Sequence, residues 1–65
     1  MLEQGQSVIV QTVTGPVRRI VWEDMGWVVM VCSDRQFDSL KRGWPAPDPI
    51  GFKREDVCAP VAASH

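Results

Sequence analysis

The chain has 65 residues, of which 45% are hydrophobic and 23% are charged. These fractions are close to those of ordinary soluble globular proteins, so they argue against a disordered chain and favour one small folded domain. Seven Lys and Arg residues against eight Asp and Glu residues give a net charge of -1, which supplies no overall attraction to nucleic acid or to an anionic membrane.

The first predicted elements are two strands joined by a tight reversal. A strand is expected over residues 6–13, where Val8 and Val10 share one apolar face. Gly and Pro in residues 14–16 are expected to end this strand, and a second strand follows over 17–22. This pattern predicts an antiparallel pair.

The most informative stretch is residues 15–32, which contain a second hairpin. Two runs rich in Val, Ile and Trp flank a short acidic turn at 23–26 that ends in Gly. The strand at 27–32 is apolar on both faces, which predicts a central strand whose second face is covered by a helix, a loop or another subunit. Trp22 and Trp27 bracket the turn and are interpreted as a cross-strand clamp, with an aromatic binding platform as the alternative.

A short helix is expected directly after this hairpin. Ser33 and Gln36 have the spacing of a capping box, in which each side chain satisfies a backbone N–H of the first turn. Phe37 begins an apolar stripe at helical spacing, and Gly43 is placed to end the helix. The proline-rich residues 45–49 are interpreted as a stiff extended connector.

The remaining residues predict the closure of a small β domain. We expect a short strand at 50–52, one tight helical turn at 53–56, and a last strand at 57–59 that pairs with the first. The fold class is therefore mainly β, a small antiparallel barrel of about five strands with one short helix inserted after the third strand. A single domain is expected over 1–65, with a loose tail at 60–65.

This order of elements resembles an SH3-like small barrel. The resemblance covers roughly residues 5–59 and is carried by the opening Gly5-x-x-Val8-x-Val10, the re-entry Gly15-Pro16-Val17, the hairpin from Trp22 to Trp27 and the ending from Ile50 to Val57. The chain is similar to small bacterial proteins of this type, some of which are carried on mobile gene cassettes. Such barrels serve as peptide readers, nucleic-acid binders and subunits of larger assemblies, so the resemblance implies a fold rather than one activity.

Among barrels of this kind, the type II dihydrofolate reductases are tetrameric enzymes with a Val-Gln-Ile-Tyr stretch that lines a central pore. This chain has no Tyr, and its most similar segment is Ile9-Val10-Gln11-Thr12. A small-molecule site between subunits is therefore the third hypothesis only, and we expect neither an enzyme nor a cofactor. Glu23 and Asp24 are expected to be solvated turn acids rather than a catalytic pair.

The two cysteines, Cys32 and Cys58, do not form a CxxC pair, and His65 is the only histidine. A metal site is not expected, and both cysteines are interpreted as buried, poorly reactive thiols. No basic and apolar leader or long apolar run is present, so we expect a cytoplasmic chain that does not enter a membrane.

The leading functional hypothesis is a protein-interaction module that binds a protein partner or forms a homo-oligomer through the second apolar face or an unpaired barrel edge. The alternative is weak nucleic-acid binding by an Arg and Trp surface. Within that alternative, Arg18, Arg35 and Arg42 are the favoured cations because each lies near an aromatic residue. The candidate surface residues are Arg18, Ile20, Trp22, Trp27, Val28, Met30, Arg35, Arg42 and Trp44.

Overall fold

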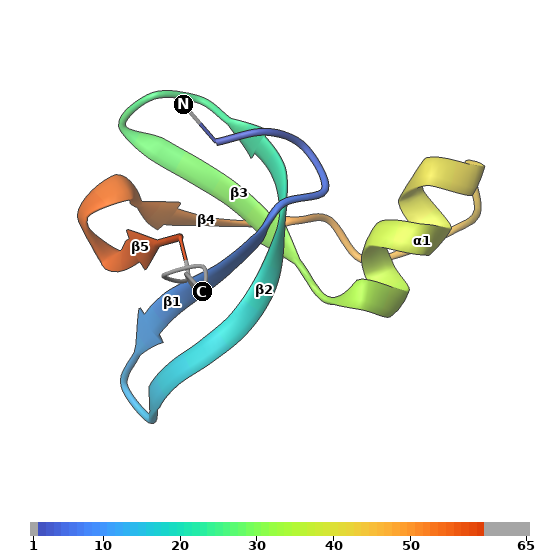
Figure 1. Ribbon diagram of the computed structural model, residues 1–65. Helices are drawn as coiled ribbons and strands as arrows, with labels where there is room; N and C mark the ends of the chain where they lie inside the picture. Colours follow the sequence, from blue (N-terminus) through green and yellow to red (C-terminus); the bar gives the residue numbers. More distant parts are fainter. Residues whose placement is uncertain (1, 60–65) are drawn as a thin grey trace, which may run out of the picture.

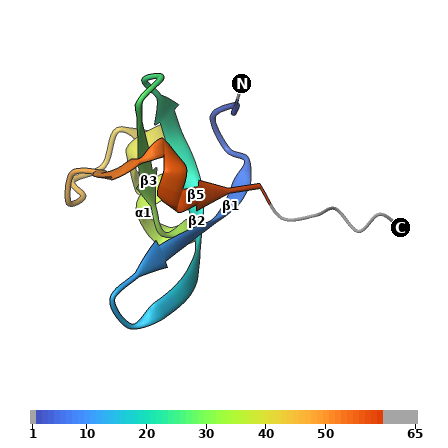
Figure 2. The same cartoon turned by 90° about the vertical axis from the view of Figure 1, so that its left-hand side faces the viewer.

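The computed structural model describes residues 2–59, so the tail expected at 60–65 lies outside the described residues. The elements in chain order are β1 (Ser7–Thr12), β2 (Gly15–Asp24), β3 (Val28–Cys32), α1 (Asp34–Arg42), β4 (Ile50–Lys53), the 3-10 helix η1 (Arg54–Asp56) and β5 (Val57–Cys58). The five strands form one curled antiparallel sheet in the order β4-β3-β2-β1-β5 (Figures 1 and 2). The expected fold class, with five strands and one helix after the third, is confirmed.

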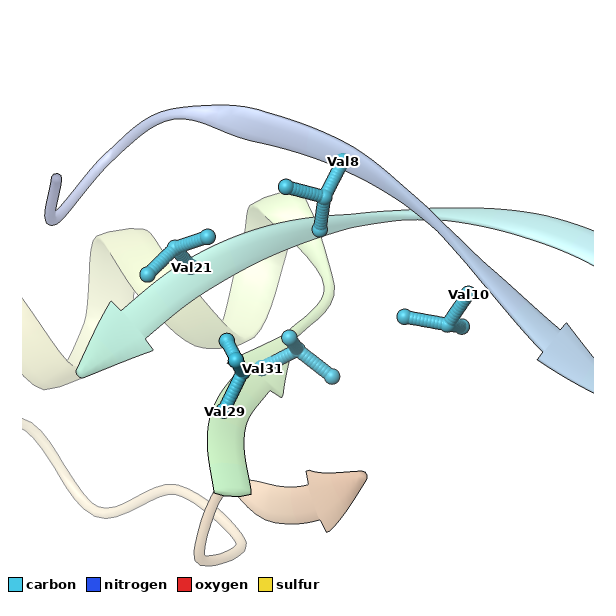
Figure 3. Close-up of a cluster of buried hydrophobic side chains, with 5 residues drawn as sticks. All are labelled: Val8, Val10, Val21, Val29 and Val31. Atoms are coloured by element: carbon cyan, nitrogen blue, oxygen red, sulfur yellow. The ribbon is translucent and has the colours of Figure 1, made fainter. Parts of the chain in front are cut away.

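The largest part of the buried core is a cluster of valines on one face of the curled sheet, and Ile20 and Cys32 are buried as well. Side chains alternate across a strand, so every second residue of β1, β2 and β3 points to the same side. Five of these are at most 2% exposed and gather in one cluster (Figure 3): Val8, Val10, Val21, Val29 and Val31. The expected apolar face of the first strand, with Val8 and Val10, is therefore confirmed.

The turn between β1 and β2 is shorter than expected. Gly15 and Pro16 already pair with β1, and only Val13 and Thr14 connect the strands. The Thr12 hydroxyl donates to the Gly15 carbonyl oxygen at 2.8 Å and accepts the Thr14 N–H at 3.2 Å. Gly15 has φ +115°, which a side chain would disfavour. The side-chain hydrogen bonds of Thr12 allow the reversal to be completed before the glycine.

The turn between β2 and β3 also differs from the expectation. The second strand continues to Asp24, and β3 begins at Val28 instead of Trp27. The register shifts between Val21 and Glu23, which places a bulge at Trp22. A bulge adds a residue to one strand and increases its twist, so the hairpin turns two residues later than the composition indicates.

Helix α1 begins and ends as its sequence predicts. The Gln36 N–H donates to the Ser33 hydroxyl at 3.1 Å, and the reciprocal bond of the capping box is also present. Gly43 closes the helix in the left-handed conformation at φ 76°. No residue of α1 is fully buried, and the helix lies at one side of the sheet, away from β5 (Figure 1).

After α1, residues 44–49 run without helix or strand to β4. The Gln36 side-chain amide donates to the carbonyl oxygens of Pro47 and Asp48 at 2.7 and 3.0 Å, which fastens this connector to the helix. The last strand, β5, pairs with β1 as expected, through Ile9 opposite Cys58 and Val10 opposite Val57.

Candidate interaction surface

Asp24, at the end of β2, joins three segments of the chain through its side chain. Its carboxylate accepts the N–H of Gly26 at 2.9 Å and the N–H of Leu2 at 3.0 Å, and it forms an ion pair with Arg54. The side chain of Asp24 is 2% exposed. The hydrogen bond from Arg54, followed by those from the two backbone N–H groups, holds the pKa of Asp24 well below its usual range.

The expectation that both turn acids remain solvated is therefore wrong for Asp24, whereas Glu23 is exposed. Asp24 lies two residues before Gly26, and an Asp side chain commonly accepts the N–H two residues later in a turn. The spacing of Asp24 and Gly26 in the sequence therefore indicates the hydrogen bond between them. The ion pair with Arg54 joins residues 30 positions apart, and no local pattern indicates it.

Arg54 ties the β2–β3 turn to η1. Its guanidinium donates to the Gly26 carbonyl oxygen as well as to Asp24, and its backbone N–H donates to the Trp27 carbonyl oxygen at 3.0 Å. Within the turn, the Met25 N–H donates to the Val28 carbonyl oxygen at 2.9 Å. These contacts hold the backbone of the turn at several points. The exposed side chains of the turn are therefore attached to a well-ordered backbone.

The side chain displayed by this turn is Trp27, which is 80% exposed; Met25 beside it is 55% exposed. Trp27 lines an open groove of about 420 Å³ together with Lys53, Arg54 and Glu55. We call the exposed set Met25, Trp27, Lys53 and Glu55 the hairpin-tip surface. Lys53 and Glu55 form no ion pair with any other described residue.

The predicted clamp between Trp22 and Trp27 is wrong. Trp22 packs edge-on against Phe37 of α1, with ring centroids 5.8 Å apart and an interplanar angle of 76°. Because the bulge lies at Trp22, that residue leaves the regular cross-strand register, and Trp27 lies outside β3. The two indoles therefore have separate roles: Trp22 attaches the helix to the sheet, and Trp27 faces solvent.

The second apolar face, which was expected to bind a partner, is largely occupied by the chain itself. Ile20 is 7% exposed and therefore not available for contact. Val28 and Met30 are half-buried and lie across Gly51 of β4, where an added Cβ would meet Val28 Cγ1 at 2.9 Å and Met30 Sδ at 3.1 Å. The absence of a side chain at Gly51 makes room for these two residues on the sheet.

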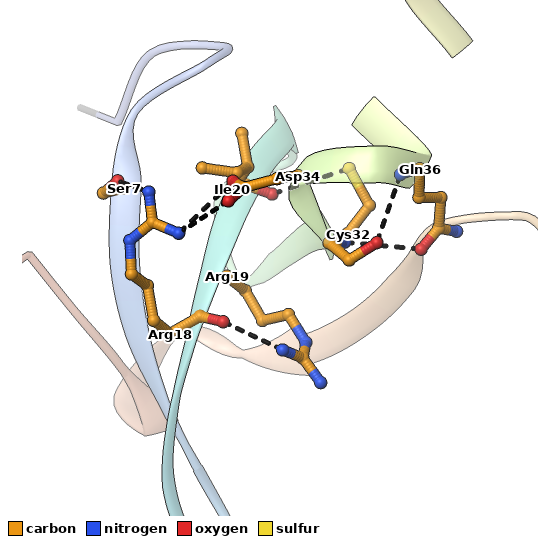
Figure 4. A network of polar contacts seen from close by, with 8 residues as sticks. Ser7, Arg18, Arg19, Ile20, Cys32, Asp34 and Gln36 are labelled. Carbon is orange, nitrogen blue, oxygen red and sulfur yellow. Dashed lines mark hydrogen bonds and ion pairs between the residues drawn. The ribbon is translucent and has the colours of Figure 1, made fainter. Parts of the chain in front are cut away.

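Two of the arginines named for the nucleic-acid alternative are paired with carboxylates. Arg18 donates to both carboxylate oxygens of Asp34, at 3.0 and 3.2 Å, and to the Ser7 hydroxyl at 3.0 Å (Figure 4). Arg42 pairs with Asp38 at 2.9 Å. Arg35 is exposed and forms no ion pair within residues 2–59. Two of the three favoured cations are thus locally neutralised.

Trp44 lies just after α1, at the start of the connector to β4. It is 57% exposed, and the Arg42 guanidinium carbon is 5.0 Å from its ring centroid. This is the geometry of a cation–π contact. Trp44 is therefore a second exposed indole, but one already covered in part by a residue of its own chain.

The two cysteines have different environments, and one of them contradicts the expectation. Cys32 is buried, and burial, together with the charge of Asp34, raises the pKa of its thiol. Cys58 is exposed, because β5 is an edge strand of only two residues. The interpretation of both thiols as buried is therefore wrong for Cys58, and neither forms a disulfide.

Within residues 2–59, no three side chains of the types that bind metal ions come together, and none of the described helices has the length and apolarity needed to span a membrane. Comparison of the chain with protein-family models finds no match, and comparisons with curated proteins and with solved structures find none either. The hairpin-tip surface is therefore the feature of the described residues that bears most directly on function.

Proposed function

We propose that this chain is a non-enzymatic protein-interaction module that contacts its partner through the hairpin-tip surface. The observation that carries the proposal is the 80% exposure of Trp27 on a turn clamped by Asp24 and Arg54. The order of the strands and the single inserted helix support the resemblance to SH3-like barrels, a fold that often serves binding rather than catalysis.

An exposed indole on a rigid support is well suited to recognition for two energetic reasons. A Trp side chain buries about 150–250 Å² when it is covered, and Trp is enriched among the residues whose truncation costs about 2 kcal/mol or more at interfaces. The clamp on residues 24–27 lowers the conformational entropy lost on binding, because the turn is already ordered. Both effects favour protein contact at Trp27.

Nucleic-acid binding is the weaker alternative. Arg18, Arg42 and Arg54 are paired with carboxylates, so binding to phosphate would first have to break these contacts. The net charge of -1 adds no general attraction. The hairpin tip has one cation and one anion beside an indole. A protein surface can pair with both charges, whereas a polyanion would be repelled by the anion.

The free thiols of Cys32 and Cys58 support a cytoplasmic location, because disulfides are favoured in oxidising compartments.

The proposal is tested by capture from a cell extract on immobilised wild-type chain, Trp27→Ala and Trp44→Ala, followed by mass spectrometry. We expect proteins retained by the wild type and by Trp44→Ala but lost with Trp27→Ala. Identical profiles for all three folded chains, together with no Trp27-dependent self-association, would contradict the proposal.

A further inference from the structure

We propose that the partner of the hairpin-tip surface is a second copy of this chain, bound across a twofold axis so that Trp27 of each copy enters the groove of the other. This inference rests on the proposed function of that surface. The charges that flank the indole and the residues that line the groove both suit a self-complementary contact.

The charges are the first argument. Lys53 and Glu55 line the same groove beside Trp27, and neither forms an ion pair with another described residue. A twofold contact places each patch against an identical patch in the reversed direction. Lys53 then faces Glu55 of the partner subunit, and the reciprocal pair forms by symmetry. A surface with one unpaired charge of each sign is thus complementary to its own copy.

The groove is the second argument. It is open, has a volume of about 420 Å³, and Trp27 itself forms part of its lining. When each Trp27 enters the groove of the partner subunit, the two indoles come into contact. Each indole then lies beside Lys53 and Glu55 of the partner subunit. Arg54 is held by Asp24 and Gly26, so the wall of the groove does not have to rearrange when the second copy enters.

The expected affinity follows from the size of the contact. One Trp buries about 150–250 Å², whereas a standard interface buries roughly 800 Å² on each partner. The contact is therefore small, and we expect a dimer that dissociates in the micromolar range or above. The net charge of -1 opposes association only slightly.

The first experiment is sedimentation velocity of the full chain from about 10 µM to about 1 mM, the range in which such a dimer exchanges with its monomer. We expect the weight-average mass to rise from 7.3 kDa toward twice that value. Trp27→Ala is expected to remain monomeric throughout. Trp44→Ala removes the other exposed indole and is expected to behave as the wild type.

The second experiment tests the charge pairing with two single variants, Lys53→Glu and Glu55→Lys. Each alone places like charges across the twofold axis, so each is expected to lose most of its self-association, at least about tenfold. An equimolar mixture restores opposite charges at both positions and is expected to form mixed dimers, detected by native mass spectrometry. The inference is overturned if the mixture associates no better than either variant alone.

The two proposals fail separately. A wild-type chain that stays monomeric up to about 1 mM, or a Trp27→Ala variant that dimerises like the wild type, overturns the second copy as the partner. If a foreign protein is then still captured in a Trp27-dependent manner, the proposed function stands with another partner. If neither a dimer nor Trp27-dependent capture is found, both proposals are overturned.

Discussion

The carboxylate of Asp24 and the guanidinium of Arg54 meet in an ion pair between the end of β2 and the start of η1, and the Asp24 side chain is 2% exposed there. The same carboxylate accepts backbone N–H groups from Leu2 and Gly26. One side chain therefore joins the N-terminal segment, the β2–β3 turn and η1. The position of Trp27 depends on this junction, which links the stability of the fold to the candidate surface.

Replacing Asp24 with Asn is expected to destabilise the domain. The amide has nearly the shape of the carboxylate, but it removes the charge that pairs with Arg54, and its NH₂ group cannot accept a backbone N–H. We expect the midpoint of thermal unfolding to fall by roughly 5–10 °C, a large change for a domain of this size. Circular dichroism measures this shift, and Glu23→Gln, at the exposed neighbour, is the matched control and should leave the midpoint unchanged.

The low pKa of folded Asp24 also predicts how stability depends on pH. The unfolded carboxyl has its usual pKa near 3.8, and the folded one lies below it. A lowered folded pKa means that the stabilising contribution is complete above about pH 5 and is lost as the pH falls through the unfolded and then the folded pKa. Urea unfolding between about pH 7 and pH 2 should show this loss. The Asp24→Asn variant should show a smaller decrease over the same range, and equal decreases in the two chains would contradict the assignment.

The cysteines are expected to differ in reactivity in the native state. The thiolate is the reactive form, and burial raises the pKa of Cys32, whereas Cys58 is exposed. Iodoacetamide near neutral pH should therefore add one group to the folded chain, located at Cys58 by peptide mapping, and a second group only in denaturant. Modification of Cys32 at the same rate as Cys58 in the folded chain would show that the sheet opens readily at β3.

Gly51 is expected to be intolerant of a side chain because of what lies over it. A Cβ added there would be 2.9 Å from Val28 Cγ1, which is a steric overlap with a side chain that has little rotational freedom. We expect Gly51→Ala to cost about 1–3 kcal/mol of unfolding free energy. In the Val28→Ala background the same substitution should cost much less, so a double-mutant cycle by urea unfolding separates overlap from backbone effects. An unchanged cost in that background would exclude the overlap with Val28 as its cause.

Several elements of the fold were predictable because their causes are local. The alternation of Val8 and Val10 predicts a strand with one buried face, and the spacing of Ser33 and Gln36 predicts the helix start that the structure contains. Gly43 likewise ends α1 as expected. In each case the residues that decide the geometry lie within about four positions of one another, so their pattern in the sequence is sufficient.

The candidate site was only partly predictable. Trp27 was among the expected surface residues, but its expected partner, Trp22, is attached to Phe37 instead. No local pattern indicates that Lys53 and Glu55 lie near Trp27, because their proximity arises from the pairing of β3 with β4. Arg18 and Arg42 are the favoured cations of the nucleic-acid alternative only, and their pairing with Asp34 and Asp38 weakens that alternative.

By itself, the sequence determined the type and order of the elements, the apolar face of the first strand and both ends of the helix. Only the tertiary structure decided the bulge at Trp22, the ion pair of Asp24 with Arg54, and the exposure of Trp27 and Cys58. The physical reason is the range of the interactions. Capping and alternation act between near neighbours along the chain, whereas register, burial and ion pairing depend on which distant segments the closed sheet brings together.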